Sequence, residues 1–118
     1  MSFLTLASRI SLEVYPRKAE FMAFGGATKH VLVNKGYTRI AVKVKCSNNK
    51  LYKVSPVYSF IDPGASQDLE ILRNEGEARI DKLVLVYKRA LPDDQDPKAT
   101  FTSVTGCHKI VLPLIVLS

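Results

Sequence analysis

Apolar and polar residues alternate along much of this chain with the two-residue period of a β-strand. The clearest case is residues 39–46, where the apolar side chains are Ile40, Val42, Val44 and Cys46. Lys43 and Lys45 stand between them. Because successive side chains of a strand point to opposite faces, this segment predicts a strand with one buried face and one lysine-bearing face.

Similar patterns predict further strands. Alternation indicates strands around residues 12–14, 31–33 and 69–71, and a short one at residues 21–24. The apolar run at residues 83–87 is typical of a strand that is covered on both faces or lies in a sheet centre. The apolar segment at residues 110–117 is far shorter than the ~20 residues of a membrane span, so it predicts a final buried strand.

Turn-forming residues separate these segments. They lie at residues 25–26, 34–36, 47–49 and 62–66, and residues 92–97 form a polar stretch typical of a loop. Residues 98–104 are compatible with a short helical turn, but their β-branched side chains argue against a long helix. Turns at this spacing favour an all-β sandwich or barrel, and the length of 118 residues fits a single domain over residues 1–118.

Composition and charge narrow the class of protein. Apolar residues make up 47% of the chain and charged residues 24%, a balance typical of globular domains. The net charge of +6 favours acidic partners, whether acidic peptide, anionic lipid or nucleic acid, without selecting one. The two cysteines, Cys46 and Cys107, favour a reducing compartment, although one bridge between them stays open. The N-terminus lacks the pattern of a signal peptide, so a soluble, cytoplasmic protein is expected.

The residue patterns of enzymes and metal sites are lacking. Cys107 and His108 are adjacent, and neighbours in a strand point to opposite faces, which disfavours a nucleophile pair. The two cysteines and two histidines lack the spacing of a zinc site. Gly25-Gly26 lies outside any phosphate-loop pattern, and the aspartates at 93, 94 and 96 lack the glycine and glutamate of a calcium loop. We therefore expect a non-enzymatic protein without a cofactor or a metal.

The centre of the chain carries a more specific pattern. Residues 42–56 read VKVKCSNNKLYKVSP and lead into residues 60–66, FIDPGAS. The segment LEVYP precedes them at residues 12–16, and DKLVLV follows at residues 81–86. Together these segments resemble the major sperm protein (MSP) domain family, which includes nematode sperm proteins and the VAP proteins of the endoplasmic reticulum. The resemblance covers about residues 10–117.

The resemblance implies an immunoglobulin-like seven-stranded β-sandwich of the MSP/PapD-like type. Pro16 and Pro56 each lie beside an expected strand, where a missing backbone donor marks an edge, bulge or kink. Members of the family often have cis peptide bonds at such positions, which let an edge strand switch sheets. We therefore hypothesise a cis Tyr15–Pro16 bond, with plain trans kinks as the alternative. A structural turn is expected at Asp62, Pro63 and Gly64.

The VAP branch of the family implies a candidate partner-binding site. In VAP proteins the lysine-bearing strand and a second strand form a basic groove that binds short acidic peptides of the FFAT type. The matching positions in this sequence are Lys43, Lys45, Cys46, Ser47, Lys82 and Val84. The chain departs from VAP proteins in having Cys46-Ser47 in place of Thr-Thr and Val84 in place of Met. A solvated strand face is the plainer interpretation of the lysines.

The sperm branch implies a different role. MSP proteins work in the cytoskeleton of amoeboid nematode sperm, and MSP itself dimerises and forms filaments without bound nucleotide. Our first hypothesis is therefore a protein of the sperm pseudopod that self-associates, for example as a homodimer, or modulates MSP filament assembly. The second is an adaptor for acidic peptides. The third is a basic nucleic-acid-binding domain, which the scattered tyrosines disfavour, so a protein partner is expected rather than nucleic acid or an inserted membrane.

Overall fold

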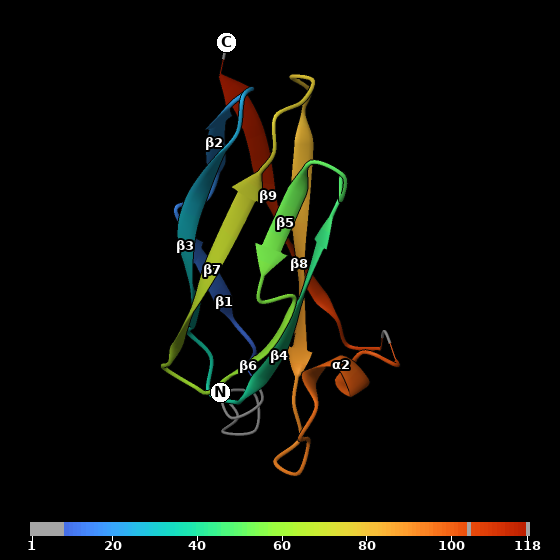
Figure 1. The fold of residues 1–118 in the computed structure, drawn as a ribbon. Helices are drawn as coiled ribbons and strands as arrows, with labels where there is room; N and C mark the ends of the chain where they lie inside the picture. The colour runs from blue at the N-terminus through green and yellow to red at the C-terminus, as the bar shows by residue number, and fades with distance from the viewer. Residues whose placement is uncertain (1–8, 104, 118) are drawn as a thin grey trace.

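The computed structural model describes residues 9–103 and 105–117, and these form two β-sheets packed face to face (Figure 1). The four-stranded sheet has the order β1 (Leu12–Tyr15), β3 (Gly26–Asn34), β7 (Ser66–Arg73) and β5 (Tyr52–Ser55). The five-stranded sheet has the order β2 (Ala19–Met22), β9 (His108–Leu117), β8 (Asp81–Arg89), β4 (Ile40–Cys46) and β6 (Tyr58–Ile61). Paired strands are antiparallel except for β2 and β9. The arrangement is the expected immunoglobulin-like sandwich.

Two prolines each separate a pair of short strands, and the pair β5 and β6 was not predicted as strands from the sequence. Pro16 separates β1 from β2, and Pro56 separates β5 from β6. In both cases the two halves lie in different sheets. The described residues therefore contain nine strand segments rather than seven, because a proline interrupts the ladder where the chain crosses between layers. The Tyr15–Pro16 and Ser55–Pro56 peptide bonds are both cis.

The core lies between the sheets and takes the apolar set of each alternating strand. On β4, the side chains of Ile40, Val42 and Val44 are buried, as the pattern predicts. The remaining large core residues are Leu12, Val14, Phe21, Leu32, Tyr52, Ile61, Leu69, Ile71, Leu83, Leu85, Leu112 and Leu114. Full burial of one such aliphatic side chain stabilises the fold by about 1.5–3 kcal/mol, so burial of this set contributes strongly to folding.

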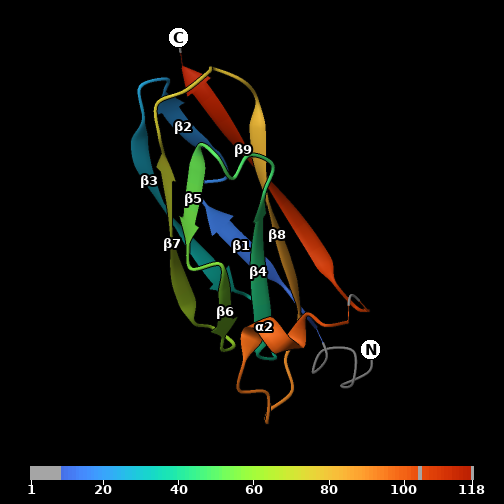
Figure 2. The same cartoon turned by 45° about the vertical axis from the view of Figure 1, so that its right-hand side comes forward.

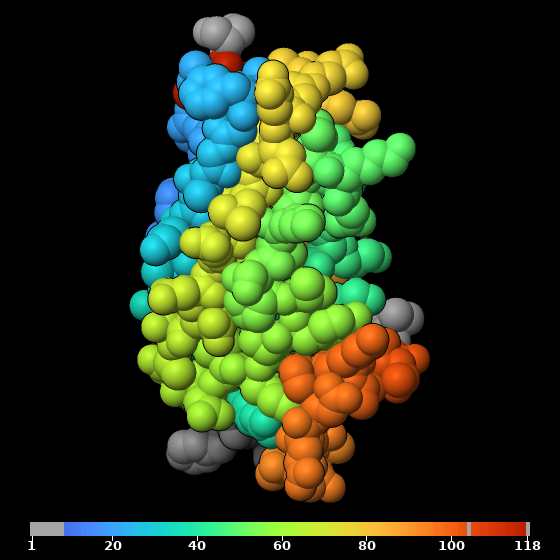
Figure 3. All heavy atoms as spheres, in the orientation of Figure 1, coloured from blue at the N-terminus to red at the C-terminus, as the bar shows by residue number. Residues whose placement is uncertain are grey.

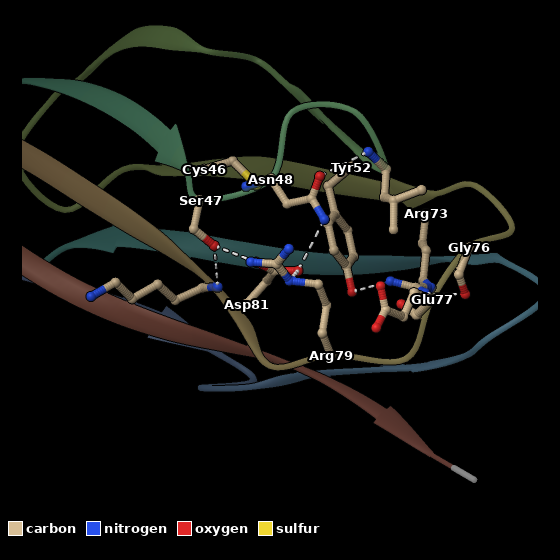
Figure 4. Close-up of polar contacts among 11 residues, drawn as sticks. Cys46, Ser47, Asn48, Tyr52, Arg73, Gly76, Glu77, Arg79 and Asp81 are labelled. Carbon is tan, nitrogen blue, oxygen red and sulfur yellow. Dashed lines mark hydrogen bonds and ion pairs between the residues drawn. The ribbon is translucent and has the colours of Figure 1, made fainter.

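Buried polar residues fasten the loops to this core. The Arg73 guanidinium donates to the Tyr52 hydroxyl at 2.7 Å and to the carbonyls of Gly76 and Glu77 at 3.0 and 2.8 Å (Figure 4). The guanidinium therefore holds the β7–β8 loop against β5. At the crossing from β1 to β2, the His30 ring lies 2.9 Å from the carbonyl oxygen of Pro16.

The turn predicted at residues 62–66 is a β-turn. The amide of Ala65 donates to the carbonyl of Asp62 at 3.0 Å. Pro63 and Gly64 occupy the two central positions, and Gly64 has a φ of 76°. A positive φ at the second central residue is the requirement of a type II turn, which explains the glycine there.

Two boundaries differ from the sequence-based prediction. The strand expected at residues 21–24 is β2, which ends at Met22 because the chain turns there and the Gly25 amide donates to the Met22 carbonyl. The polar loop at residues 92–97 ends in the short helix α2 (Pro97–Thr100), capped by the Asp96 carboxylate. No helix within residues 9–103 and 105–117 is long and apolar enough to cross a membrane.

Candidate protein-binding surface

The outer face of the five-stranded sheet carries the lysines that the sequence singled out. Strand register aligns its side chains in rows across β4, β8 and β9. One row holds Lys45, Val84 and Val111, and the next holds Lys43, Val86 and Lys109. Because side chains of one row share a face, two lysines of β4 and one of β9 lie around apolar residues of β8.

A groove opens on this face, and we call it the outer-face groove. Its volume is 380 Å³, and it is lined by Lys43, Lys45, Val86, Phe101, Cys107 and Lys109. Val86 forms its floor and is only 7% exposed. None of the described side chains that line the groove is acidic.

The segment around α2 builds one wall of this groove. α2 lies across the ends of β4 and β6 (Figure 2). Figure 3 shows this segment in orange, packed against the end of the sandwich. The Phe101 ring lies 6.2 Å from the ring of Tyr58, and the Lys43 ammonium lies 5.8 Å from the same tyrosine ring. The Phe101 ring therefore lines the wall near Lys43, which suits a ligand with both apolar and acidic groups.

Ser47 takes part in an internal hydrogen-bond network and does not line the outer-face groove. Its hydroxyl donates to Asp81 Oδ1 at 2.8 Å and accepts from the Lys82 amide at 3.0 Å. Asn48 Nδ2 donates to Asp81 Oδ2 at 3.2 Å, and Arg79 Nε lies 3.6 Å from the same oxygen (Figure 4). The Asp81 side chain is buried, so these partners balance its charge. The network joins the end of β4 to the start of β8.

Cys46 points away from the outer-face groove. Its side chain packs partly against the core, and its Sγ accepts a bond from the Asn48 amide at 3.4 Å. Burial raises the pKa of the Cys46 thiol, the nearby Asp81 carboxylate adds to this, and the Asn48 amide opposes it. The thiol is therefore protonated at neutral pH and is a weak nucleophile. Cys46 and Cys107 are both free, so the structure lacks the bridge that the sequence left open.

The structure thus divides the six residues predicted to bind a partner. Lys43, Lys45 and Val84 share the outer face, and the exposed Lys82 lies on the same face in the row beyond Lys45. Cys46 and Ser47 do not join them. The sequence prediction omitted Val86, Phe101 and Lys109. The two-residue period of β8 and β9 places Val86 and Lys109 on this face. Phe101 lies there because of tertiary packing, which no local sequence pattern predicts.

The surface combines positive charge with an apolar floor. Exposed lysine–carboxylate pairs contribute about 0–1 kcal/mol each, so three lysines around an apolar floor steer and orient an acidic ligand rather than bind it tightly. Within the part of the chain that the structure describes, no group of histidine, cysteine, aspartate and glutamate side chains is placed to hold a metal ion.

Comparisons with known proteins agree with the fold and with the motifs. The MSP (Major sperm protein) domain family matches residues 11–106. Sperm-specific class P protein 10 of Caenorhabditis elegans is 38% identical over 105 residues, which cover 89% of this chain and 96% of that protein.

Solved structures extend the likeness. The structure of SSP-19, an MSP-domain protein like family member in Caenorhabditis elegans, has a TM-score of 0.85 and 34% identity, and covers 89% of this chain and 98% of its own. A PapD-like domain of human CEP192 has a TM-score of 0.57 and 9% identity over 100% of this chain and 91% of its own, so it shares the fold alone. This chain therefore belongs to the MSP domain family.

Proposed function

We propose that this chain is a non-enzymatic protein-interaction module of the nematode sperm cytoskeleton, which self-associates or modulates the assembly of MSP filaments. The observation that carries the proposal is the match to the MSP domain family, together with relatives described as sperm-specific in Caenorhabditis elegans. Those relatives match the chain over nine-tenths of their own length, so the similarity is to whole proteins of similar size. The chain then acts in the cytoplasm of sperm through contacts with other proteins.

Sedimentation velocity tests this proposal. The purified chain is run over a concentration series, alone and with purified MSP. We expect either a sedimentation coefficient that rises with concentration or comigration with MSP. A monomer at every concentration that also leaves the sedimentation of MSP unchanged would contradict the proposal.

A second candidate function is recognition of short acidic, FFAT-like peptides, and the outer-face groove favours it. Lys43, Lys45 and Lys109 surround an apolar floor, and Phe101 supplies an aromatic wall. Acidic side chains of a ligand would contact the ammonium groups while an apolar side chain enters the groove. Such binding weakens with salt, because exposed charge pairs are screened over about 8 Å at physiological ionic strength.

A peptide titration tests this second function. The probe is a peptide with acidic residues flanking one phenylalanine. We expect K43E and K109E each to weaken binding by about fivefold, and K35E to have no effect, since Lys35 lies in the exposed turn after β3. Equal weakening by all three substitutions would show that the effect depends on net charge alone, and it would exclude the outer-face groove as the binding site.

A further inference from the structure

Strand β9 is covered by a neighbouring strand along only part of one side. β8 pairs with β9 from His108 to Leu114, whereas β2, on the other side, pairs with it only from Leu114 to Leu117. Among the described strands, none lies beside residues 109–113 on that second side. The first half of β9 therefore has an open edge.

The chain itself leaves this position free when it crosses between the sheets. β2 runs parallel to β9 with Ala19 opposite Leu114, so a straight continuation would place residues 14–18 opposite residues 109–113. Instead the chain crosses to the other sheet at Pro16, and the residues before it form β1 there. The position of one strand beside β9 thus stays open.

The register of the sheet determines which backbone groups face this open edge. In an antiparallel ladder, the backbone groups of alternate residues point to the same side. On β4 the Val44 amide donates toward β6, so its neighbour Lys45 turns its backbone groups toward Val84 of β8. The same alternation, followed across β8 to β9, turns the amides and carbonyls of Lys109 and Val111 away from β8 and toward the open edge. These groups lack a partner strand within the described chain.

Pro113 supports this assignment. A proline lacks the amide that a strand interior uses for pairing, so within sheets it is confined to edges and bulges. Pro113 belongs to the same alternate set as Lys109 and Val111, and its nitrogen therefore faces away from β8. The proline is tolerated in the middle of β9 because no donor is required on that side.

A gap of 190 Å³ between the two sheets lies beside the open edge, and we call it the β1–β9 gap. Its lining residues are Leu12, Glu13, Val14, Tyr15, Arg17 and Ile110. One carboxylate and one guanidinium line the gap, so its charge is balanced. Ile110 is partly buried at the gap, whereas Val111, on the opposite face of β9, is 54% exposed. Apolar side chains are therefore available on both faces of the open edge.

We propose that the open edge of β9 binds an extended, uncharged segment of a partner protein as an added antiparallel strand. The added strand exchanges backbone hydrogen bonds with Lys109 and Val111, and antiparallel pairing is the slightly more stable kind. A residue bonded to Val111 has its side chain beside Val111 on the outer face, and its two neighbours enter the β1–β9 gap beside Ile110. β-branched residues suit both faces, because they pack well on a pleated surface.

A second copy of this chain fits the edge less well than an uncharged segment. Two-fold pairing of two β9 edges around Val111 would place Lys109 of one copy beside Pro113 of the other, in the row that also holds Lys82. Like charges in one row destabilise strand pairing, and each copy carries a net charge of +6. A partner segment without lysine or arginine avoids this repulsion.

This edge is separate from the outer-face groove, with which it shares only Lys109. The inference goes beyond the proposed function, because it rests on unpaired backbone groups and requires neither self-association nor MSP. Since the segment is uncharged, its binding is expected to change little with salt, unlike that of an acidic peptide.

The test uses a blocked peptide of four Thr-Val repeats, whose valines enter the β1–β9 gap, and two N-methylated versions of it. We expect the unmodified peptide to slow hydrogen exchange of the Val111 amide by about tenfold at saturation, because that amide gains an acceptor. The Ile110 amide, which faces β8, serves as the control and should change by less than about twofold. Methylation of the threonine amides removes the donors that face β9 and abolishes binding. Methylation of the valine amides, which point away from β9, leaves the affinity within about threefold.

Variants of the chain locate the peptide. V111P removes the donor at the open edge and is expected to abolish binding, while its midpoint of urea denaturation stays close to that of the parent chain, since the Val111 amide lacks a partner strand there. V111T, which keeps the amide and a β-branched side chain, should bind within about threefold of the parent. K43E, in the outer-face groove, should leave binding unchanged.

The proposal is overturned by unchanged Val111 exchange with peptide bound, by equal affinity of the threonine-methylated peptide, or by absence of binding at millimolar peptide. Loss of binding through K43E would place the peptide in the outer-face groove instead. Protection of the Val111 amide that rises with the concentration of the chain alone would assign the edge to a second copy and would also overturn it. If V111P does not fold, the methylated peptides decide the question on the parent chain.

Discussion

Single residues at the ends of β-strands hold the loops of this protein. Arg73 is the clearest example, because its guanidinium donates to one hydroxyl and two carbonyls from a position that is 3% exposed. The sequence gives no sign of this role, since an arginine at the end of an alternating strand has the pattern of a solvated residue. Burial and partners of a charged side chain depend on the loop that folds over it, which no local period encodes.

Replacement of Arg73 by leucine is expected to destabilise the protein by about 3 kcal/mol. The leucine keeps some packing but leaves the Tyr52 hydroxyl and the carbonyls of Gly76 and Glu77 without their donor. Urea denaturation measures the change. R17L is the control, because Arg17 is exposed, and we expect its effect to stay within about 0.5 kcal/mol. Equal stability of R73L and R17L would show that the guanidinium bonds are dispensable.

The Cys46 thiol is expected to be less reactive than an ordinary exposed thiol. Since burial raises the pKa of Cys46, the thiolate fraction at a given pH is smaller than for an ordinary thiol. In a C107S variant, the rate of Cys46 alkylation should therefore rise with pH and level off only above the pKa of a free thiol. Iodoacetamide kinetics between pH 7 and 10 measure this. A plateau at or below the ordinary thiol pKa would contradict the burial seen for Cys46.

Secondary-structure elements were predicted from the sequence better than the roles of single residues or the arrangement of the surface. The alternation on β4 fixes which side chains enter the core, and the prolines at 16 and 56 mark where strands change sheets. Residues 83–87 are predicted to be covered on both faces or to lie in a sheet centre, and β8 is the central strand of the five-stranded sheet. On its outer face, Val86 is buried and Val84 is partly covered. The segment that carries Phe101 covers part of the outer face of β8. How far this cover extends depends on the length of the loop around α2, so the sequence of β8 alone does not predict it.

The turn between β2 and β3 offers a test at this scale. Gly25 has a φ of 119°, and a Cβ placed there would lie 2.8 Å from the Arg73 carbonyl oxygen. G25A should cost about 2 kcal/mol of unfolding free energy, through both the backbone conformation and this contact. G106A is the matched control, since Gly106 also has a positive φ, of 76°, but a Cβ there meets open space. Urea denaturation of both variants should rank G25A as the less stable.

At the scale of the whole molecule, the net positive charge favours acidic partners. The net charge is +6, and the outer-face groove concentrates three of its lysines around one apolar floor. The sequence predicted a basic surface and two of these lysines. It could not place Lys109 beside them, because that proximity depends on β9 pairing with β8.

A double reversal, K43E/K109E, lowers the net charge by two units per site, from +6 to +2. We expect association with the acidic phenylalanine peptide to slow, and its dependence on salt to become shallower, because steering by the surface potential is reduced. Stopped-flow kinetics at low and physiological ionic strength measure both effects. K18E/K35E, which carries the same net change away from the groove, should retain more of the association rate; equal slowing of the two variants would argue against local steering.

The switching of strands between sheets has a consequence for aggregation. The outermost strands of the two sheets are β1 and β5 in one and β2 and β6 in the other, and they are the halves of the two divided strands. Each is only four residues long. A short edge is a poor template for stacking identical chains into fibrils, because too few backbone groups are exposed in register. By dividing its edge strands, the fold keeps each outermost strand short and so limits fibril growth, and unpaired backbone remains in partly covered stretches such as the end of β4 and residues 108–113 of β9.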